Sequence, residues 1–126
     1  MANILVAEDD GAVRDFVRRG LELHGHEVTA VADGGEAAQL LFCADRAFDL
    51  LLADIRMPVM DGIALALRAA RDCPLMPVLL MTGYADQRER ARELEAIIRG
   101  VLQKPFTLEQ LAGAVTLALE PGEAGR

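Results

Sequence analysis

The sequence alternates short runs of strand-forming residues with longer segments whose apolar residues recur at helical spacing. The strand-like runs are Asn3–Ala7, Glu27–Val31, Leu50–Ala53, Val78–Met81 and Val101–Gln103. The helical patterns cover Gly11 to about His24, Glu36–Ala44, Ile63–Arg71, Ala85–Glu95 and Thr107–Leu119. Because strands and helices alternate with short connections, we expect an α/β fold, a doubly wound, five-stranded parallel sheet with five helices.

Several residues at the ends of these segments predict caps and turns. Asp10 precedes the first helical pattern and is expected to be its N-cap. Thr107, with Gln110 three residues later, has the spacing of a capping box. We expect turns at 33–35 and at Asp61-Gly62, where Gly62 would adopt a backbone angle that other residues avoid.

The length and charge of the chain fit one folded domain. Its 126 residues, 52% of them hydrophobic, are enough to bury a core without disulfides. We expect the domain to cover residues 1–120, with a short flexible tail at 121–126. No apolar stretch approaches the roughly 20 residues needed to cross a membrane. The net charge of −7 argues against a nucleic-acid-binding surface.

The beginning of the sequence and its two cysteines indicate a cytoplasmic protein. The start, MANILVAEDD, has no basic segment before its apolar run, and it turns acidic at once, unlike a secretory signal. Cys43 and Cys73 are isolated, with neither CxxC spacing nor a nearby histidine. We expect buried or half-buried thiols in a reducing compartment.

Polar residues stand directly after four of the strand-like runs. They are Glu8, Asp9 and Asp10 after the first run, Asp54 after the third, Thr82 after the fourth and Lys104 after the fifth. In a doubly wound parallel sheet, ligands bind at the carboxyl ends of the strands, near the point where the strand order reverses. The predicted fold therefore gathers carboxylates, a hydroxyl and an ammonium at one edge of the sheet.

Clustered carboxylates repel one another unless they share a cation. Mg²⁺ binds a few carboxylate oxygens and keeps several waters, which leaves room for a phosphoryl oxygen. With the metal held by Asp9, Asp54 is a possible nucleophile toward phosphorus that forms an acyl phosphate. Lys104 and Thr82 would interact with the other phosphoryl oxygens, because phosphoryl transfer needs mainly positioning and charge neutralisation.

Four stretches in this order, LVAEDD, LLLADIRMPVMDG, LLMTGYA and VLQKPF, resemble the motifs of the response-regulator receiver domain of two-component signalling. The resemblance covers about residues 1–119 and implies the flavodoxin-like receiver fold. It implies that Asp54 is the phosphoacceptor, served by a phosphohistidine on a histidine kinase or a histidine phosphotransfer protein. It also implies that Thr82 is the switch hydroxyl and that Lys104 is the family's lysine, followed by a cis peptide bond before Pro105.

The same resemblance implies a complete set of magnesium ligands. Glu8 and Asp9 match the family's acidic pair, with Asp9 in direct contact with the metal and Glu8 acting through water. Asp54 itself and the backbone carbonyl of Arg56, two residues later, would complete the protein ligands.

One position departs from the family pattern. The aromatic residue usually found three positions before the lysine is replaced by Val101. A valine cannot swing a ring between two environments, so the output surface would signal through backbone shifts or exposed apolar residues. Ile97 and Ile98 are candidates, although packing beneath the preceding helix is the favoured interpretation for both.

We therefore predict a stand-alone response regulator, not an enzyme, that switches protein–protein binding on phosphorylation. The stretches ILVAEDD, FDLLLADI, MDGIALA and VLQKPF are similar to single-domain regulators of the CpdR kind, which steer substrates to an energy-dependent protease. A protease complex is thus a candidate output partner, and neither nucleic acid nor membrane is expected.

Several alternatives stay open from the sequence. A phosphorelay shuttle would pass the phosphoryl group to a histidine phosphotransfer protein. A phosphate-ester hydrolase using an aspartyl-phosphate is disfavoured, because such enzymes usually carry a second aspartate where this chain has Arg56. An FMN binder is disfavoured by the absence of tryptophan from the sequence. A receiver that never accepts phosphate is disfavoured because all the key residue types are present.

Overall fold

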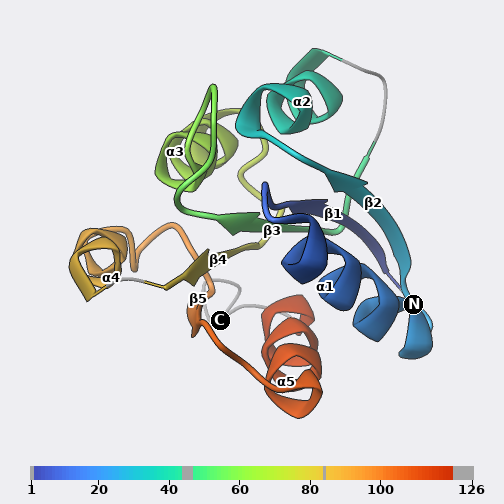
Figure 1. Ribbon diagram of the computed structural model, residues 1–126. Helices are drawn as coiled ribbons and strands as arrows, with labels where there is room; N and C mark the ends of the chain where they lie inside the picture. Colours follow the sequence, from blue (N-terminus) through green and yellow to red (C-terminus); the bar gives the residue numbers. More distant parts are fainter. Residues whose placement is uncertain (1, 44–46, 84, 121–126) are drawn as a thin grey trace.

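A single five-stranded parallel sheet runs through the computed structural model, which describes residues 2–43, 47–83 and 85–120 (Figure 1). Its strands are β1 (Asn3–Ala7), β2 (Glu27–Val31), β3 (Leu50–Asp54), β4 (Val78–Thr82) and β5 (Gly100–Gln103). The helices are α1 (Gly11–Leu23), α2 (Gly34–Ala38) with its π-helical continuation η1 (Gln39–Cys43), α3 (Gly62–Asp72), α4 (Ala85–Arg92) and α5 (Leu108–Leu119). The predicted α/β fold with five helices is confirmed.

The strand order β2-β1-β3-β4-β5 reverses direction between β1 and β3. This is the flavodoxin-like order, in which the ligand site lies beyond the carboxyl ends of the strands at the reversal. In the register of β1 and β3, Ala7 is the partner of Ala53. Glu8 and Asp54 each come one residue later, so the sheet itself brings these two acids side by side.

Side-chain alternation along the strands divides the core into two layers. Ile4 and Val6 of β1 and Leu50 and Leu52 of β3 pack with the buried residues of α1 and α5. The alternate residues of the same strands pack with α2, α3 and α4 on the opposite face. Since successive strand residues point to opposite faces, the apolar runs must fill both layers, which explains why they lack polar residues.

The predicted caps are present, with one correction at Gly62. The Asp10 side chain accepts hydrogen bonds from the N–H groups of Ala12 and Val13, and Thr107 forms the expected capping box with Gln110. Gly62 is the first residue of α3 and has no positive φ, so the predicted turn there is wrong. Glycine is needed instead because an added Cβ would lie 2.4 Å from the Asp54 carbonyl oxygen.

The start of α2 and the end of α4 lie two or more residues from the predicted positions. The segment 33–35 is not a separate turn, because α2 begins at Gly34, with Asp33 as an N-cap that accepts a hydrogen bond from the Glu36 N–H. Helix α4 ends at Arg92 instead of Glu95. The chain continues there as turns, in one of which the Leu94 N–H donates to the Ala91 carbonyl at 3.0 Å. These turns place the apolar residues that follow α4 against the core.

The turns after α4 bring Ile97 and Ile98 inward. Ile98 is buried, and Ile97 is half-buried against the same core, so the favoured packing interpretation of both residues is confirmed.

Cys73 is half-buried as expected, but Cys43 is exposed at the end of η1. The Lys104–Pro105 peptide is cis. Residue Ala44 of the predicted second helix and the predicted tail 121–126 lie outside the described residues.

Candidate functional site

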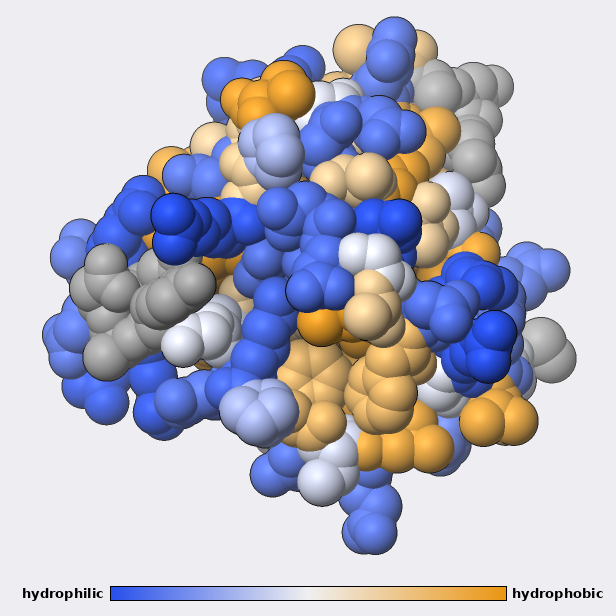
Figure 2. Space-filling model, in the orientation of Figure 1, coloured by the Kyte–Doolittle hydropathy of each residue, from blue (hydrophilic) through white to orange (hydrophobic). Residues whose placement is uncertain are grey.

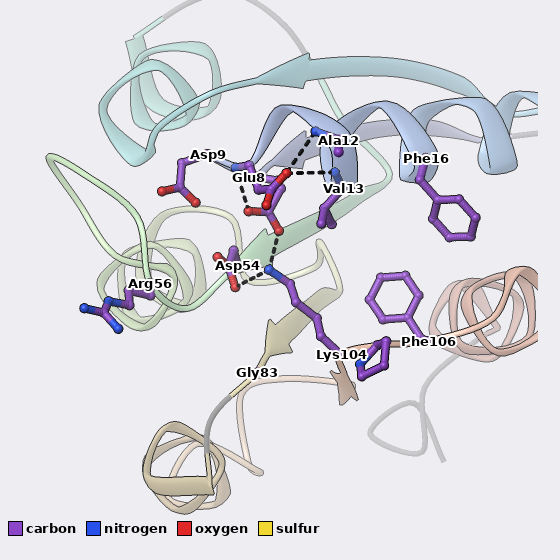
Figure 3. A pocket seen from close by; sticks show the side chains of 12 residues that line it. Glu8, Asp9, Ala12, Val13, Phe16, Asp54, Arg56, Gly83, Lys104 and Phe106 are labelled. Carbon is purple, nitrogen blue, oxygen red and sulfur yellow. Dashed lines mark hydrogen bonds and ion pairs between the residues drawn. The ribbon is translucent and has the colours of Figure 1, made fainter.

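Lys104 joins the two acids that end β1 and β3. Its Nζ lies 2.6 Å from Glu8 Oε1 and 3.3 Å from Asp54 Oδ1, as the dashed lines of Figure 3 show. Lys104 follows β5, and its backbone N–H donates to the Thr82 carbonyl at 2.8 Å. Side chains from three strand ends, separated widely in the sequence, therefore converge at one point of the sheet edge.

Glu8 is the first residue after β1, and hydrogen bonds to its backbone and its side chain hold it in place. Its N–H donates to the Val31 carbonyl of β2 at 3.1 Å, which extends the sheet by one residue. Its carbonyl accepts a hydrogen bond from Arg14 Nη1 at 2.8 Å, and Oε2 accepts one from the Asp10 N–H at 3.0 Å. Glu8 is fully buried at 0% exposure, so its carboxylate has a defined position.

Asp9 and Asp10 have different environments. Asp10 Oδ1 is occupied by the N–H groups of Ala12 and Val13, at 2.9 and 3.2 Å, so Asp10 acts as the cap of α1. Asp9 is exposed beside Glu8. One oxygen from each of Glu8, Asp9 and Asp54 lies within 4.8 Å of the others. These three carboxylates, without Asp10, form the acidic cluster of the site.

Thr82 ends β4, the strand next to β3, and Arg56 is in the loop after Asp54. Thr82 is fully buried at the end of β4, and it continues the Val78 and Leu80 series that faces the α3 layer. Arg56 lies two residues after Asp54 and lines the same cleft. Its side chain points away from Asp54 in Figure 3.

Burial and charge shift the pKa values of the three central groups. Burial raises the pKa of Glu8 from 4.5 to about 7, although Lys104 opposes this shift. Burial likewise raises the pKa of Asp54, against the attraction of Lys104. Burial lowers the pKa of Lys104, but its hydrogen bond to Glu8 and the charge of Asp54 outweigh burial, so the pKa is raised overall. The ammonium therefore keeps its charge and shares it between two carboxyls.

The donor set of the acidic cluster fits a hard divalent cation. Magnesium prefers oxygen ligands and commonly takes one or two carboxylates with several waters. The three clustered carboxylates carry more negative charge than Lys104 alone neutralises. Asp9 is exposed, so a hydrated cation has access to its oxygens. Glu8, Asp9 and Asp54 are thus suitable magnesium ligands by their chemistry.

The site opens into a cleft of about 850 Å³ whose outer part is apolar. Phe16 of α1 and Phe106, after β5, line it with ring centroids 6.3 Å apart. Figure 2 shows an orange apolar surface between the positions of α1 and α5, next to hydrophilic surface. Phe16 recurs at helical spacing with Val17 and Leu21, a pattern typical of core residues, whereas its side chain is 42% exposed, so the sequence pattern alone does not indicate this part of the cleft.

Comparisons with known proteins agree with this geometry. The family model of the response regulator receiver domain matches residues 4–116. The response regulator receiver protein CpdR of Brucella abortus is 38% identical over 115 residues, which are 91% of this chain and 94% of that protein. Response regulator MprA of Mycolicibacterium vanbaalenii is 37% identical over 108 residues. These cover 86% of this chain but 46% of MprA, so the chain spans less than half of that relative.

Solved receiver structures share the fold. A response regulator receiver domain protein from Clostridium thermocellum superposes with a TM-score of 0.85 at 24% identity, covering 94% of each chain. The chemotaxis response regulator CheY4 of Vibrio cholerae gives a TM-score of 0.80 at 31% identity, covering 92% of this chain and 97% of CheY4. The chain belongs to the response regulator receiver domain family. Receiver domains act mainly as phosphorylation-regulated switches that interact with histidine kinases and output domains.

No described helix is both long and apolar enough to span a membrane.

Proposed function

We propose that this protein is a single-domain response regulator in which Asp54 accepts a phosphoryl group from a phosphohistidine donor in a magnesium-dependent reaction. The supporting observation is the convergence of the Glu8, Asp9 and Asp54 carboxylates with the Lys104 ammonium. A lone aspartate at a strand end would need no such neighbours. The match over 94% of the CpdR sequence supports a regulator of about this size.

In the proposed transfer, an oxygen of the Asp54 carboxylate attacks phosphorus. The bond between phosphorus and the donor imidazole nitrogen breaks, and its electron pair stays on that nitrogen. Lys104, 3.3 Å from Asp54 before transfer, is placed to pair with a phosphoryl oxygen afterwards. Thr82, at the end of the adjacent strand, would donate its hydroxyl hydrogen to another oxygen. The products are an aspartyl phosphate and a dephosphorylated histidine.

Magnesium would supply charge neutralisation for the remaining phosphoryl oxygens. Glu8, Asp9, Asp54 and the carbonyl of Arg56 would hold it. The pKa of Asp54 is raised by burial, so a nearby cation would also favour the ionised form that attacks phosphorus.

The apolar outer part of the cleft suits a protein donor. A small phosphate compound would gain little from Phe16 and Phe106, whereas a helix carrying the phosphohistidine would bury them. We propose a histidine kinase or a histidine phosphotransfer protein as the donor.

Phosphorylation would then change binding to an output protein, for which the similarity to CpdR suggests a protease complex. We propose the cytoplasm as its location, because both cysteines are free thiols.

Phosphorylation of Asp54 is tested by incubating the protein with acetyl phosphate and measuring intact mass. The wild type should gain one phosphoryl group per chain in the presence of Mg²⁺ and none in excess EDTA. Asp54→Asn should gain none, and Glu27→Gln, which alters an exposed acid on β2, should behave as the wild type. Equal labelling of Asp54→Asn and wild type would contradict the proposal.

Two further measurements separate the alternatives. Many turnovers of an aryl phosphate would indicate a hydrolase, whereas a single stoichiometric label supports a receiver. Return of the label from Asp54 to a purified histidine phosphotransfer protein would identify a phosphorelay shuttle.

A further inference from the structure

The loop between Asp54 and α3 contains a tight turn of rare backbone geometry. The Met60 N–H donates to the Pro58 carbonyl at 2.8 Å, and Val59 between them has a φ of 71°. A hydrogen bond from the N–H of one residue to the carbonyl two residues earlier, with a positive φ at the residue between them, is typical of the strained form of the γ-turn. A β-branched residue strongly avoids positive φ. Such a conformation persists only where surrounding structure fixes it.

The surrounding structure includes the first residue of α2. The Gly34 N–H donates to the Pro58 carbonyl at 3.3 Å, on the same turn. A Cβ added to Gly34 would lie 1.7 Å from the Met60 carbonyl oxygen and 2.6 Å from its carbon. The obstacle is backbone, so no change of side-chain rotamer could relieve the contact. An alanine at this position would therefore have to displace either α2 or the turn.

The far end of the loop is held in a similar way. The Gly62 N–H donates to the Ile55 carbonyl at 2.9 Å, and an added Cβ would overlap the Asp54 carbonyl oxygen. Arg56 lies between this closure and the turn held by Gly34. The loop that carries the candidate metal-binding carbonyl is thus anchored at two points where backbone packs directly on a glycine.

We propose that Gly34 is a positioning residue for the metal site. It fixes the Pro58–Met60 turn and, through the short loop, the Arg56 carbonyl. The inference rests on the proposed function, because it takes magnesium as the ligand. Gly34 does not line the cleft itself. Helix formation does not explain the glycine either, because alanine stabilises a helix better than glycine.

Magnesium affinity of the folded protein tests the proposal, measured by isothermal titration calorimetry on wild type and Gly34→Ala. We expect Gly34→Ala to bind Mg²⁺ about tenfold more weakly, as is typical when the support of a metal ligand is lost. The control is Gly20→Ala, whose added Cβ would lie 2.5 Å from Leu108 Cδ1 at the contact of α1 with α5. It alters the contact of α1 with α5 without touching the loop, so its Mg²⁺ affinity should stay within about twofold of wild type.

Equal Mg²⁺ affinity of Gly34→Ala and wild type would overturn this inference and leave the proposed function intact. Absence of Mg²⁺ binding by the wild type would instead overturn the metal dependence in the proposed function, and this inference with it. If Gly34→Ala does not fold, amide NMR of the wild type decides. The Gly34 amide resonance should shift during a Mg²⁺ titration with the same affinity as that of Asp54. The Gly113 amide on α5 should not shift, and an unmoved Gly34 resonance would refute the positioning role.

Discussion

The Lys104 ammonium lies closer to Glu8 than to Asp54, at 2.6 Å from Glu8 Oε1 and 3.3 Å from Asp54 Oδ1. Glu8 is fully buried, whereas the Lys104 side chain is 22% exposed. Before phosphorylation, Lys104 therefore compensates the charge of the buried acid as well as that of the acceptor. Any new charge on Asp54 must compete with Glu8 for the same ammonium.

This competition predicts the chemical reactivity of Lys104, the only lysine in the sequence. The hydrogen bond to Glu8 and the charge of Asp54 together raise its pKa. Glu8→Gln removes a negative charge, so it should lower the pKa of Lys104 and speed its acylation by an amine reagent below pH 9. Peptide mass spectrometry measures the rate at this residue. Glu27→Gln is the control, and equal rates in the two variants would show that Glu8 does not govern Lys104.

Glu8 also predicts how stability without metal depends on pH. Its pKa is about 7 in the folded protein and 4.5 as the reference value, so the folded state binds more protons between these values. Stability should therefore fall as the pH rises from about 4.5 to about 7, by up to about 3 kcal/mol from Glu8. Burial of Asp54 acts in the same direction. Denaturant titrations in EDTA should show this fall in the wild type and a smaller one in Glu8→Gln.

Magnesium should stabilise the folded protein by relieving repulsion within the acidic cluster. A ligand at 100 times its dissociation constant adds about 2.7 kcal/mol to the free energy of unfolding. Thermal unfolding with and without Mg²⁺ measures the effect, which EDTA should reverse. Asp9→Asn should lose most of the increase, because Asp9 is the exposed carboxylate of the cluster. An undiminished increase in Asp9→Asn would place the cation elsewhere.

Two glycines on the α1–α5 side of the sheet predict different effects on stability. Gly20→Ala places a Cβ 2.5 Å from Leu108 Cδ1 and 3.3 Å from Leu111 Cδ2, so these side chains must move, and the substitution should stabilise the protein less than Gly113→Ala does. Gly113→Ala, on the exposed face of α5, meets nothing within 4 Å and should stabilise by about 0.5–1 kcal/mol through helix propensity. Urea denaturation measures both. Similar values for the two variants would contradict the close packing of α1 on α5.

Phe16 should affect transfer from a protein donor but not from a small one. Phe16→Ala removes part of the apolar lining of the cleft and leaves the acidic cluster unchanged. We expect phosphorylation by acetyl phosphate to stay at the wild-type rate, while transfer from a phosphorylated histidine phosphotransfer protein slows about tenfold or more. Leu75→Ala, at a residue 93% exposed after α3, is the control. Equal slowing by both donors would instead indicate damage to the acceptor site.

The sheet and the acidic cluster could be predicted because their signals are local. Apolar runs such as Leu50–Ala53 fit only a strand buried on both faces, and polar residues at their ends must meet once the strands are parallel. The capping box at Thr107 could likewise be predicted, because it depends only on Thr107 and Gln110. In each case a short stretch of sequence indicates the local conformation, and the parallel topology then determines which strand ends meet.

Features that depend on distant contacts could not be predicted in this way. Residues 33–35 were predicted to be a turn, because the sequence does not show that the first residue of α2 packs on the Met60 carbonyl of a distant loop. The exposure of Phe16 to the cleft depends on Phe106, which is distant in the sequence and lines the cleft beside it. The closer approach of Lys104 to Glu8 than to Asp54 likewise depends on the three-dimensional arrangement of three strand ends.

Lys104 follows β5, a four-residue strand at the margin of the sheet whose strand neighbour is β4. An edge strand separates from its sheet more readily than a central strand, and the free energy of this local opening is smaller than that of global unfolding. Local separation of β5 would carry the ammonium away from both acids while the central strands stayed folded. In this locally opened state the protein would be unable to accept a phosphoryl group, although it would close again quickly. The opening should be measurable as faster amide hydrogen exchange of Leu102 in β5 than of Leu52 in β3.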